Sequence, residues 1–151
     1  MTEFSNTKID IPDYLVQHFF EKQAVLNPFK TAVILGGINL TYRQLDNQSN
    51  QFANYLMNLG VIPGDFVGVC TERSVDMVVS VLAVLKAGCC YLPVDPSFPD
   101  DRIKYMYEDS GAKVLISQFS LKKKLRQFTN TLIVLTDADK SKISKFSTQP
   151  D

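Results

Sequence analysis

The stretch FVGVCTERSVDMVVSVLAVLKAGCCYLPVDP, residues 66–96, decides the fold class. Residues 66–70 form a short β-branched run that is typical of a strand, and Ser74 is a good N-cap for a helix over residues 75–87. This helix is apolar on nearly every side, as expected where both a sheet and further protein cover it. Gly88 ends the helix, and residues 90–94 form the next strand. A strand, a helix and a strand in this order predict two parallel strands with a right-handed connection.

Strands and helices keep alternating after residue 96, which predicts an α/β class with a layered, mostly parallel sheet and helices on both faces. Pro99 suits the first position of the next helix, so Asp100 and Asp101 stand in its first turn, where negative charge meets the helix dipole favourably. Gly111 ends this helix. The remaining expected elements are a strand over residues 113–117, a short basic helix over 121–128, a strand over 131–135 and a polar, fraying tail from Asp137.

The N-terminal third predicts two helices and a short antiparallel hairpin. Gly36-Gly37 allows the positive φ angles of a two-residue turn between strands over residues 31–35 and 38–40. Thr41 and Gln44 have the spacing of a capping box at the start of a helix that Gly60 closes. Asp13 caps an amphipathic helix over residues 14–26. We divide the chain into a flexible N-terminus (residues 1–12), one domain (13–137) and a polar tail (138–151).

The composition excludes several classes of protein. The 151 residues are 45% hydrophobic and 21% charged, which is typical of a globular domain and not of a disordered chain. The 16 basic and 16 acidic residues balance, so no overall field draws the chain to nucleic acid or to a membrane. The longest apolar run, residues 75–85, is too short to span a bilayer. Three cysteines and a polar N-terminus predict a cytoplasmic protein.

Residue types alone predict no catalytic, cofactor-binding or metal site. The glycines are spread one per turn, which is typical of turns and helix caps and not of a phosphate-binding loop. His18 has no ligand set beside it, and Cys89-Cys90 suits packing at the start of a strand better than a redox pair. The basic run of residues 122–124 with Arg126 is either a solvated helix face, which we favour, or a surface for RNA, a phosphate or a partner.

Two motifs give the chain its resemblance to a known family. LTYRQL, residues 40–45, and LKAGCCYLPVDP, residues 85–96, followed by FPDDRI, residues 98–103, resemble amino-acid adenylation domains of nonribosomal peptide synthetases. These domains belong to the acyl-AMP-forming ligase superfamily, and the likeness covers the N-terminal part of one over roughly residues 15–137. The resemblance gives scaffold roles to Leu40, Thr41, Tyr42, Gln44, Leu45, Leu85, Lys86, Ala87, Gly88, Tyr91, Pro93, Asp95, Pro96, Pro99 and Arg102.

The resemblance also implies the reaction of a complete domain. Such an enzyme uses ATP and Mg²⁺ to form an aminoacyl-adenylate with release of pyrophosphate, then passes the acyl group to a carrier-protein thiol. Its Ser/Thr/Gly-rich phosphate loop would follow the last expected strand, where this sequence has TDADK, residues 136–140, and its catalytic lysine belongs to a carboxy-terminal subdomain. Because the transition state needs such donors for its developing charge, we expect the 151-residue chain to be inactive alone.

We consider three hypotheses for the function of this chain. In the first, it is the front of an adenylation domain, and the helix over residues 75–87 carries an apolar face that the remainder covers. In the second, it is half of a split enzyme, completed in trans by a chain that carries the phosphate loop and lysine. In the third, it is a non-enzymatic module that binds a partner through residues 122–126 or an exposed sheet edge. The expected partner is the remainder of the domain, with a carrier protein only for the complete enzyme.

Overall fold

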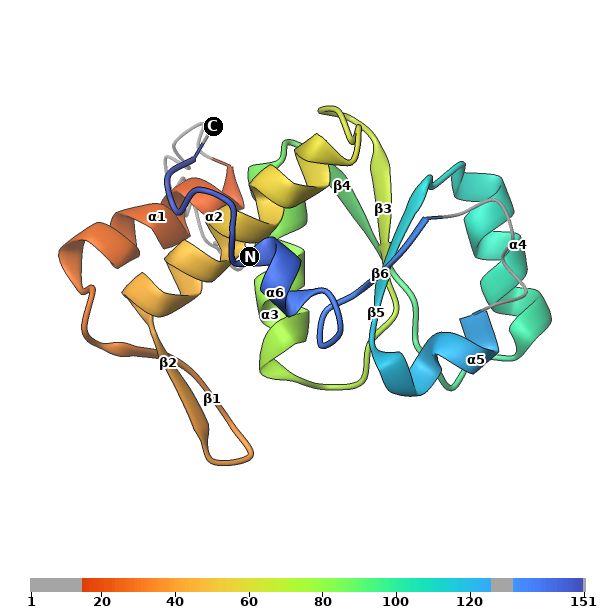
Figure 1. Ribbon diagram of the computed structural model, residues 1–151, viewed down its shortest axis with the longest axis horizontal. Helices are drawn as coiled ribbons and strands as arrows, with labels where there is room; N and C mark the ends of the chain where they lie inside the picture. The colour runs from red at the N-terminus through yellow and green to blue at the C-terminus, as the bar shows by residue number, and fades with distance from the viewer. Residues whose placement is uncertain (1–14, 126–131, 151) are drawn as a thin grey trace, which may run out of the picture.

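The structure, a computed structural model, describes residues 15–125 and 132–150 (Figure 1). The expected cap Asp13, the helix start at Tyr14, the end of the basic helix and the first residue of the last strand lie outside the described residues. The helices are α1 (Val16–Leu26), α2 (Tyr42–Asn58), α3 (Val75–Lys86), α4 (Asp100–Ser110), the 3-10 turn η1 (Phe119–Leu121), α5 (Lys122–Leu125) and α6 (Lys140–Ile143). The strands are β1 (Thr31–Leu35), β2 (Ile38–Thr41), β3 (Phe66–Val69), β4 (Cys90–Pro93), β5 (Val114–Ser117) and β6 (Leu132–Leu135).

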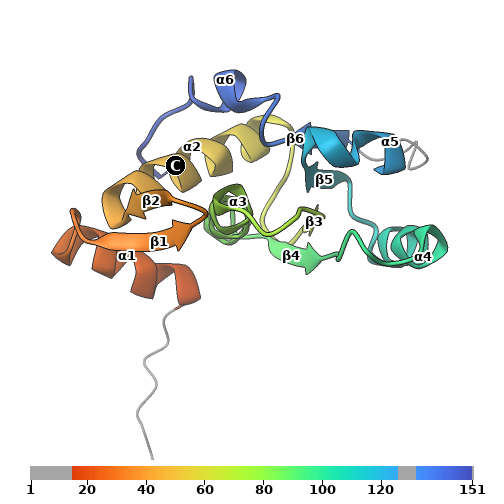
Figure 2. The ribbon, with the colours of Figure 1, turned by 90° about the horizontal axis from the view of Figure 1, so that it is seen from below.

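Four strands form a parallel sheet in the order β4-β3-β5-β6. The chain runs from β3 outward to β4, then crosses back past β3 to β5 and continues to β6. Helices α2 and α3 lie on one side of this sheet, and α4 and α5 lie on the other (Figures 1 and 2). This arrangement confirms the predicted α/β class, a layered and mostly parallel sheet with helices on both faces.

The predicted hairpin and capping box are both present. Gly36 and Gly37 have φ angles of +56° and +82°, and they join β1 to its antiparallel partner β2. The Thr41 hydroxyl accepts the Gln44 N–H at 3.2 Å, and the Gln44 side chain accepts the Thr41 N–H at 2.9 Å. These reciprocal bonds satisfy two amide groups that have no partner inside the helix, so they set where α2 begins.

Helices α3 and α4 begin in different ways. The Ser74 hydroxyl accepts the Met77 N–H at 3.1 Å, which is the predicted cap of α3. Pro99, expected as the first helical residue of α4, is its N-cap instead, and Asp100 takes the first helical position. The ψ angle of Pro99 is 145°, which is extended. A proline ring restricts φ and leaves ψ free, so the ring alone does not decide on which side of a helix boundary the residue lies.

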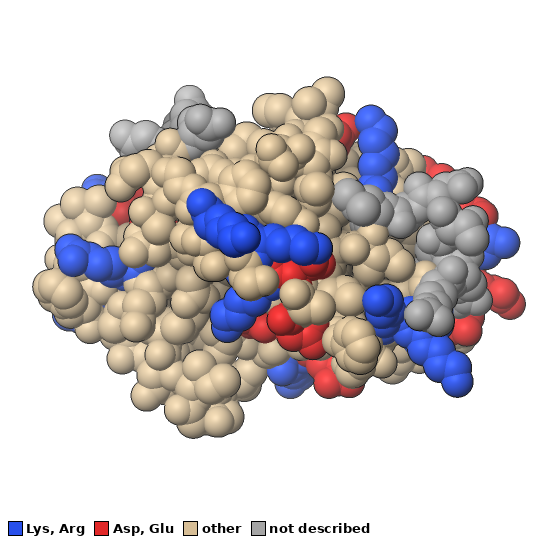
Figure 3. Space-filling view, viewed as in Figure 1, with Lys and Arg blue, Asp and Glu red and all other residues tan. Residues whose placement is uncertain are grey.

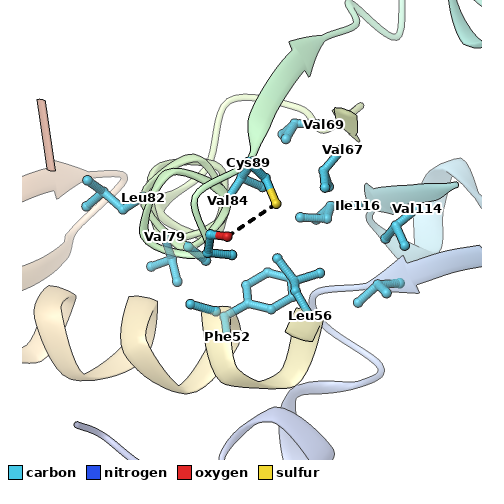
Figure 4. Close-up of a cluster of buried hydrophobic side chains, with 14 of the residues drawn as sticks. Phe52, Leu56, Val67, Val69, Val79, Leu82, Val84, Cys89, Val114 and Ile116 are labelled. Carbon is cyan, nitrogen blue, oxygen red and sulfur yellow. Dashed lines mark hydrogen bonds between the residues drawn. The ribbon is translucent and has the colours of Figure 1, made fainter. Parts of the chain in front are cut away.

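Two apolar clusters lie on the two sides of the sheet. In the larger one, Phe52 and Leu56 of α2 meet Val79 and Val84 of α3, together with inward side chains of β3 and β5 (Figure 4). The smaller cluster lies between the sheet, α4 and α5 and contains Ile103, Tyr107, Leu115 and Leu125. Helix α3 is therefore packed between the sheet and α2, as its nearly all-apolar sequence predicts.

Gly68 departs from the expectation that the glycines mark turns and caps. It lies inside β3, where an added Cβ would collide with the phenol of Tyr107 from α4. The Tyr107 side chain is buried and occupies the space that the missing side chain leaves. Close approach of another group is a common reason for glycine within a strand, and only the tertiary structure reveals it at this position.

Residues 139–149 do not fray, although their polar composition predicts it. Asp139 accepts the Leu135 N–H at 2.9 Å, α6 follows, and residues 144–149, which we call the strap, run along α2 (Figure 2). Side-chain amides of α2 bind the backbone carbonyls of the strap: Asn50 binds Thr148 (2.8 Å), Gln51 binds Ser144 and Phe146 (2.9 and 3.1 Å), and Asn54 binds Ser147 and Gln149 (3.1 and 2.9 Å). The strap is thus held by hydrogen bonds to its backbone and by the half-buried Phe146 ring, which packs against Tyr55.

Candidate functional site

The carboxyl ends of β3 and β5 are joined by hydrogen bonds. In an open α/β sheet, ligands bind where the strand order reverses, which in this sheet is between β3 and β5. Ser117 Oγ donates to the Cys70 carbonyl at 2.7 Å, and the Glu72 N–H donates to Gln118 Oε1 at 2.9 Å. These groups hold the two strand ends together, so the place where such sheets commonly bind a ligand serves as scaffold.

A groove of about 760 Å³, which we call the α3–β4 groove, lies beside this closed crevice. Half-buried Met77 and Val81 of α3 line one wall, and exposed Tyr91 of β4 lines another. Arg73 adds a positive charge, and the Thr71 hydroxyl is buried without a hydrogen-bond partner among the described residues. The groove leaves part of the apolar surface of α3 uncovered within the described part of the chain, as the fragment hypothesis predicts.

Asp95 shapes the turn at the end of this groove. Its Oδ1 accepts the Ser97 N–H at 2.8 Å. Hydrogen bonds from Ser97, together with the positive charges of Arg73 and Lys124, hold the pKa of Asp95 below its ordinary value. Asp95 is therefore an ionised residue that stabilises the turn between β4 and α4.

We predicted that the basic run is a solvated helix face, and this prediction is wrong for Lys124. Its Nζ donates to the carbonyls of Pro96 at 2.6 Å and Phe98 at 2.9 Å, and it lies 3.4 Å from the Asp100 carboxylate. These contacts fix α5 to the turn that precedes α4. The lysine at this position is a structural tie, while Arg126 lies outside the described residues. Sequence reasoning missed the contact because its partners are backbone carbonyls more than 20 residues away.

Lys86 lies in a buried ion pair. Its Nζ is 2.6 Å from both Asp46 Oδ1 and Asn50 Oδ1, and its side chain is only 3% exposed. The Phe20 ring centre lies 5.4 Å from the same ammonium group. A charge this deeply buried requires partners of this kind. The motif marked Lys86 as scaffold but missed Asp46 and Asn50, whose spacing of four residues on one helix face was the available signal.

The structure divides the motif residues between two places. Tyr91, Pro93, Asp95 and Pro96 lie along the α3–β4 groove. The LTYRQL motif lies at the start of α2, where Leu40 and Leu45 are buried, Thr41 and Gln44 form the capping box, and the Tyr42 ring packs 5.9 Å from that of Phe20. The other motif residues lie elsewhere.

At the end of α3, Leu85 is half-buried, Ala87 is buried and Gly88 has a φ angle of +71°. At the start of α4, Pro99 is the N-cap, and the Arg102 guanidinium lies 4.1 Å from the Phe98 ring centre.

The thiols do not form a reactive centre within the described residues. Burial raises the pKa of Cys70 to about 11 and also raises the pKa of Cys89, so both stay protonated near neutral pH. Cys89 is buried and Cys90 exposed, and both are free thiols, which agrees with packing and not with a redox pair. His18 is exposed on α1. Within residues 15–125 and 132–150, no three His, Cys, Asp or Glu side chains gather to hold a metal ion.

The described helices do not include one with the length and apolar character needed to cross a bilayer.

The fold and the motif positions agree with a match over most of the chain. Residues 20–151 match the family model of AMP-binding enzymes, so the chain belongs to that family. Within the family, it is similar to the N-terminal part of adenylation domains of nonribosomal peptide synthetases, which confirms the resemblance seen in the two motifs.

Three relatives illustrate the match. Bacitracin synthase 3 of Bacillus licheniformis is 45% identical over 115 residues, which is 76% of this chain and 2% of that protein. The nonribosomal peptide synthetase FmoA3, in its α-methyl-L-serine-AMP bound form, has a TM-score of 0.86 and 33% identity over 94% of this chain and 16% of its own. The N-terminal subdomain of Klebsiella oxytoca NpsA has a TM-score of 0.71 and 26% identity over 90% of this chain and 34% of its own. The chain thus spans a small part of each relative.

Proposed function

We propose that this chain is the N-terminal framework of an amino-acid-activating adenylation domain and is inactive without the remainder of that domain. The observation that carries the proposal is the α3–β4 groove, where Met77, Val81 and Tyr91 present an apolar surface that the described chain leaves open. Relatives with this segment are much longer polypeptides, which supports further protein as the cover.

The position of Pro93 indicates that further protein contacts the face of the sheet rather than the edge of β4. The Val94 N–H donates inward to the Val69 carbonyl at 3.0 Å, so the backbone nitrogen of Pro93, one residue earlier, points away from β3. Proline has no N–H, and a strand added beside β4 would lack a ladder hydrogen bond at this position. The edge of β4 is therefore a poor docking site, and the groove is the better one.

In this proposal, the complete domain forms an aminoacyl-adenylate from ATP and an amino acid and passes the acyl group to a carrier-protein thiol. The described strand ends of this chain offer no free polar groups to ATP at the switch point between β3 and β5. The polar groups at the ends of β3 and β5, where such sheets commonly bind a ligand, bind each other. ATP and Mg²⁺ are therefore assigned to the complete domain, and this chain is given no step that involves them.

The remainder of the domain belongs either to the same polypeptide or, in a split enzyme, to a separate one. A non-enzymatic module is less well supported, because Val25, Phe29 and Ile34 are 80%, 76% and 71% exposed on α1, the loop after it and β1. The domain limits, residues 1–12, 13–137 and 138–151, and a cytoplasmic location remain proposals. Three free thiols support the latter.

Amino-acid-dependent ATP–pyrophosphate exchange tests the proposal. The chain alone is compared with a chimera in which it replaces the matching segment of an adenylation domain of bacitracin synthase 3. We expect background exchange from the chain alone and clear exchange from the chimera. Exchange by the chain alone would overturn the proposed inactivity, and a folded chimera without exchange would contradict the framework role. Exchange restored by mixing the chain with a separate remainder would support a split enzyme.

The variant Tyr91→Asp tests the groove. Tyr91 is 43% exposed, so the isolated chain should tolerate the charge, whereas a remainder packed over the groove would remove the charge from water. We expect exchange by the chimera to fall about tenfold or more while the melting temperature of the isolated chain stays unchanged. Tyr105→Asp, at a tyrosine that is 66% exposed on α4, is the matched control and should keep exchange. Full exchange in both variants would rule out the groove as the contact.

A further inference from the structure

The strap is held by the side-chain amides of three residues of α2. Asn50, Gln51 and Asn54 carry two N–H groups each, and five of these six groups donate to backbone carbonyls of the strap at 2.8–3.1 Å. The sixth, on Asn50, faces Asp46 Oδ2 at 3.4 Å. Every residue has a backbone carbonyl, so these bonds recognise the path of the strap and not its side chains.

Surface charge does not account for the position of the strap. Acidic and basic side chains are interspersed over α6, from which the chain enters the strap (Figure 3). Lys142 lies 2.8 Å from Asp139, so these two charges pair at the start of α6. Lys145 is the one charged residue of the strap itself. The strap therefore depends on the hydrogen bonds from α2 and on the Phe146 ring, and both require a defined geometry.

Asn50 differs from the other two residues because both ends of its amide are bound. Its Oδ1 accepts the Lys86 ammonium at 2.6 Å, and its Nδ2 donates to the Thr148 carbonyl at 2.8 Å. The residue is 3% exposed, whereas Gln51 and Asn54 are half-buried. Asn50 therefore connects the buried ion pair at the end of α3 to the strap.

Lys86 fixes the direction in which the Asn50 amide faces. An ammonium group only donates hydrogen bonds, so the atom of Asn50 beside it is Oδ1 and not Nδ2. A flipped amide would place its NH₂ group against the ammonium and its oxygen against the Thr148 carbonyl, and both bonds would be lost. The buried charge of α3 thus determines that Asn50 presents a donor to the strap.

We infer that Asn50 is a positioning residue for the proposed adenylation reaction and that Lys86 orients it. The inference rests on the proposed function, in which the remainder of the domain binds ATP. The family match extends to residue 151, just after the strap, and the remainder is joined at that point in the chimera described above. A strap fixed on α2 therefore sets where the next segment of the domain starts. A displacement of about 1 Å far from the reacting atoms is enough to lower a rate about 100-fold.

Hydrogen exchange in the isolated chain tests the contact with the variant Asn50→Asp. The carboxylate has the shape of the amide and still accepts from Lys86, but it cannot donate to the Thr148 carbonyl. We expect hydrogen exchange in residues 146–149 to become about tenfold faster, the effect of losing one hydrogen bond, and exchange in α3 and β3 to stay unchanged.

Asn47→Asp is the matched control for this measurement. Asn47 is half-buried one turn earlier on α2 and forms none of the hydrogen bonds to the strap. The control variant should keep the slow exchange of residues 146–149. Equal exchange of the strap in the two variants, or faster exchange throughout α3 in Asn50→Asp, would overturn the assigned role, because the effect would then not run through the Thr148 contact.

The kinetics of ATP–pyrophosphate exchange by the chimera test the consequence for the reaction. Asn50→Asp should raise the KM for ATP about tenfold and change kcat less than about threefold, because fewer molecules hold the remainder in the binding-competent position. A purely structural loss would reduce the amount of folded enzyme and leave KM unchanged, so an unchanged KM would overturn the positioning role. That result leaves the proposed function intact, whereas absence of exchange by the folded, unsubstituted chimera would contradict the proposed function itself.

Discussion

The two faces of helix α3 are both apolar, but only one of them is packed against the rest of the described chain. Toward α2, Val79 and Val84 are buried against Phe52. Toward β4, Met77 and Val81 are only half-buried and line the α3–β4 groove. Apolar residues around a whole helix therefore predict that protein packs against every side of the helix, but they do not show which part of the protein does so. This chain supplies the cover on the α2 side, and we propose that the remainder of an adenylation domain supplies it over the groove.

Polar groups on the two sides do not follow the same division. On the α2 side, the buried ammonium of Lys86 is bound by Asp46 and Asn50, and Ser80 Oγ donates to a backbone carbonyl at 2.6 Å. On the groove side, the buried Thr71 hydroxyl has no partner among the described residues. The α2 side also contains buried polar atoms without a partner among the described residues, Asn54 Oδ1 and the Thr136 hydroxyl, so the burial of the apolar side chains and not the bonding of polar groups distinguishes the two sides.

The largest difference between the two sides should come from Phe52→Ala and Tyr91→Ala. Phe52 is 2% exposed in the core, so its truncation should lower the free energy of unfolding by about 3–5 kcal/mol. Tyr91 is 43% exposed, and its truncation should cost less than about 1 kcal/mol in the isolated chain. Urea denaturation monitored by circular dichroism measures both. Similar losses would show that the groove side is as completely packed as the α2 side.

The buried ion pair on the α2 side should respond asymmetrically. Asp46→Ala leaves the Lys86 ammonium buried and unpaired, and we expect a loss of about 3 kcal/mol, at the low end for buried pairs because Asp46 is 26% exposed. Lys86→Met leaves a carboxylate that water can reach and should cost less. Thermal and urea unfolding of both variants give the order. A greater loss in Lys86→Met would contradict this account of the pair.

A smaller effect is expected where the strap crosses α2. Asn54→Ala removes hydrogen bonds to the carbonyls of Ser147 and Gln149, and it should weaken attachment of the strap by about 1 kcal/mol. Hydrogen exchange should then become faster in residues 144–149 and stay unchanged in β3 and β5. Asn58→Ala, at the exposed end of α2, is the control. Equal exchange in both variants would show that the amide contacts of Asn54 do not hold the strap.

The smallest expected effect is a pH dependence of strap attachment, which depends on Asp139 at the start of α6. Burial disfavours ionisation of Asp139, but hydrogen bonds from Lys142 and the Leu135 N–H outweigh it and hold the pKa of Asp139 below its ordinary value. An acid with a lower pKa in the folded state stabilises that state above its unfolded pKa, about 3.9, and the contribution is lost as the pH falls through the folded value. The NMR signals of Phe146 should therefore shift toward a detached strap below about pH 4. Asp139→Asn should abolish this pH dependence, and an identical profile in that variant would exclude Asp139 as its source.

Local motifs were predictable because all their partners lie within a few residues of each other. The Thr41–Gln44 box and the Ser74 cap satisfy helix amides three residues away, and Gly36-Gly37 suits its turn by its own backbone freedom. The apolar helix lining the groove was predictable from residues 75–87 for the same reason. The partners of Lys124 could not be predicted, because chain folding brings them from distant positions.

The sequence by itself determined the order and type of the elements up to β6, apart from the 3-10 turn η1, together with the parallel connections and the family, since these depend on periodicity, helix caps and contiguous motifs; it missed α6. Only the tertiary structure decided that Gly68 makes room for Tyr107, that Lys86 meets Asp46, and that Asn50 joins Lys86 to the strap. The physical reason is that propensity and capping act over one or two helical turns, whereas packing and buried charge depend on groups that become neighbours only in the folded chain.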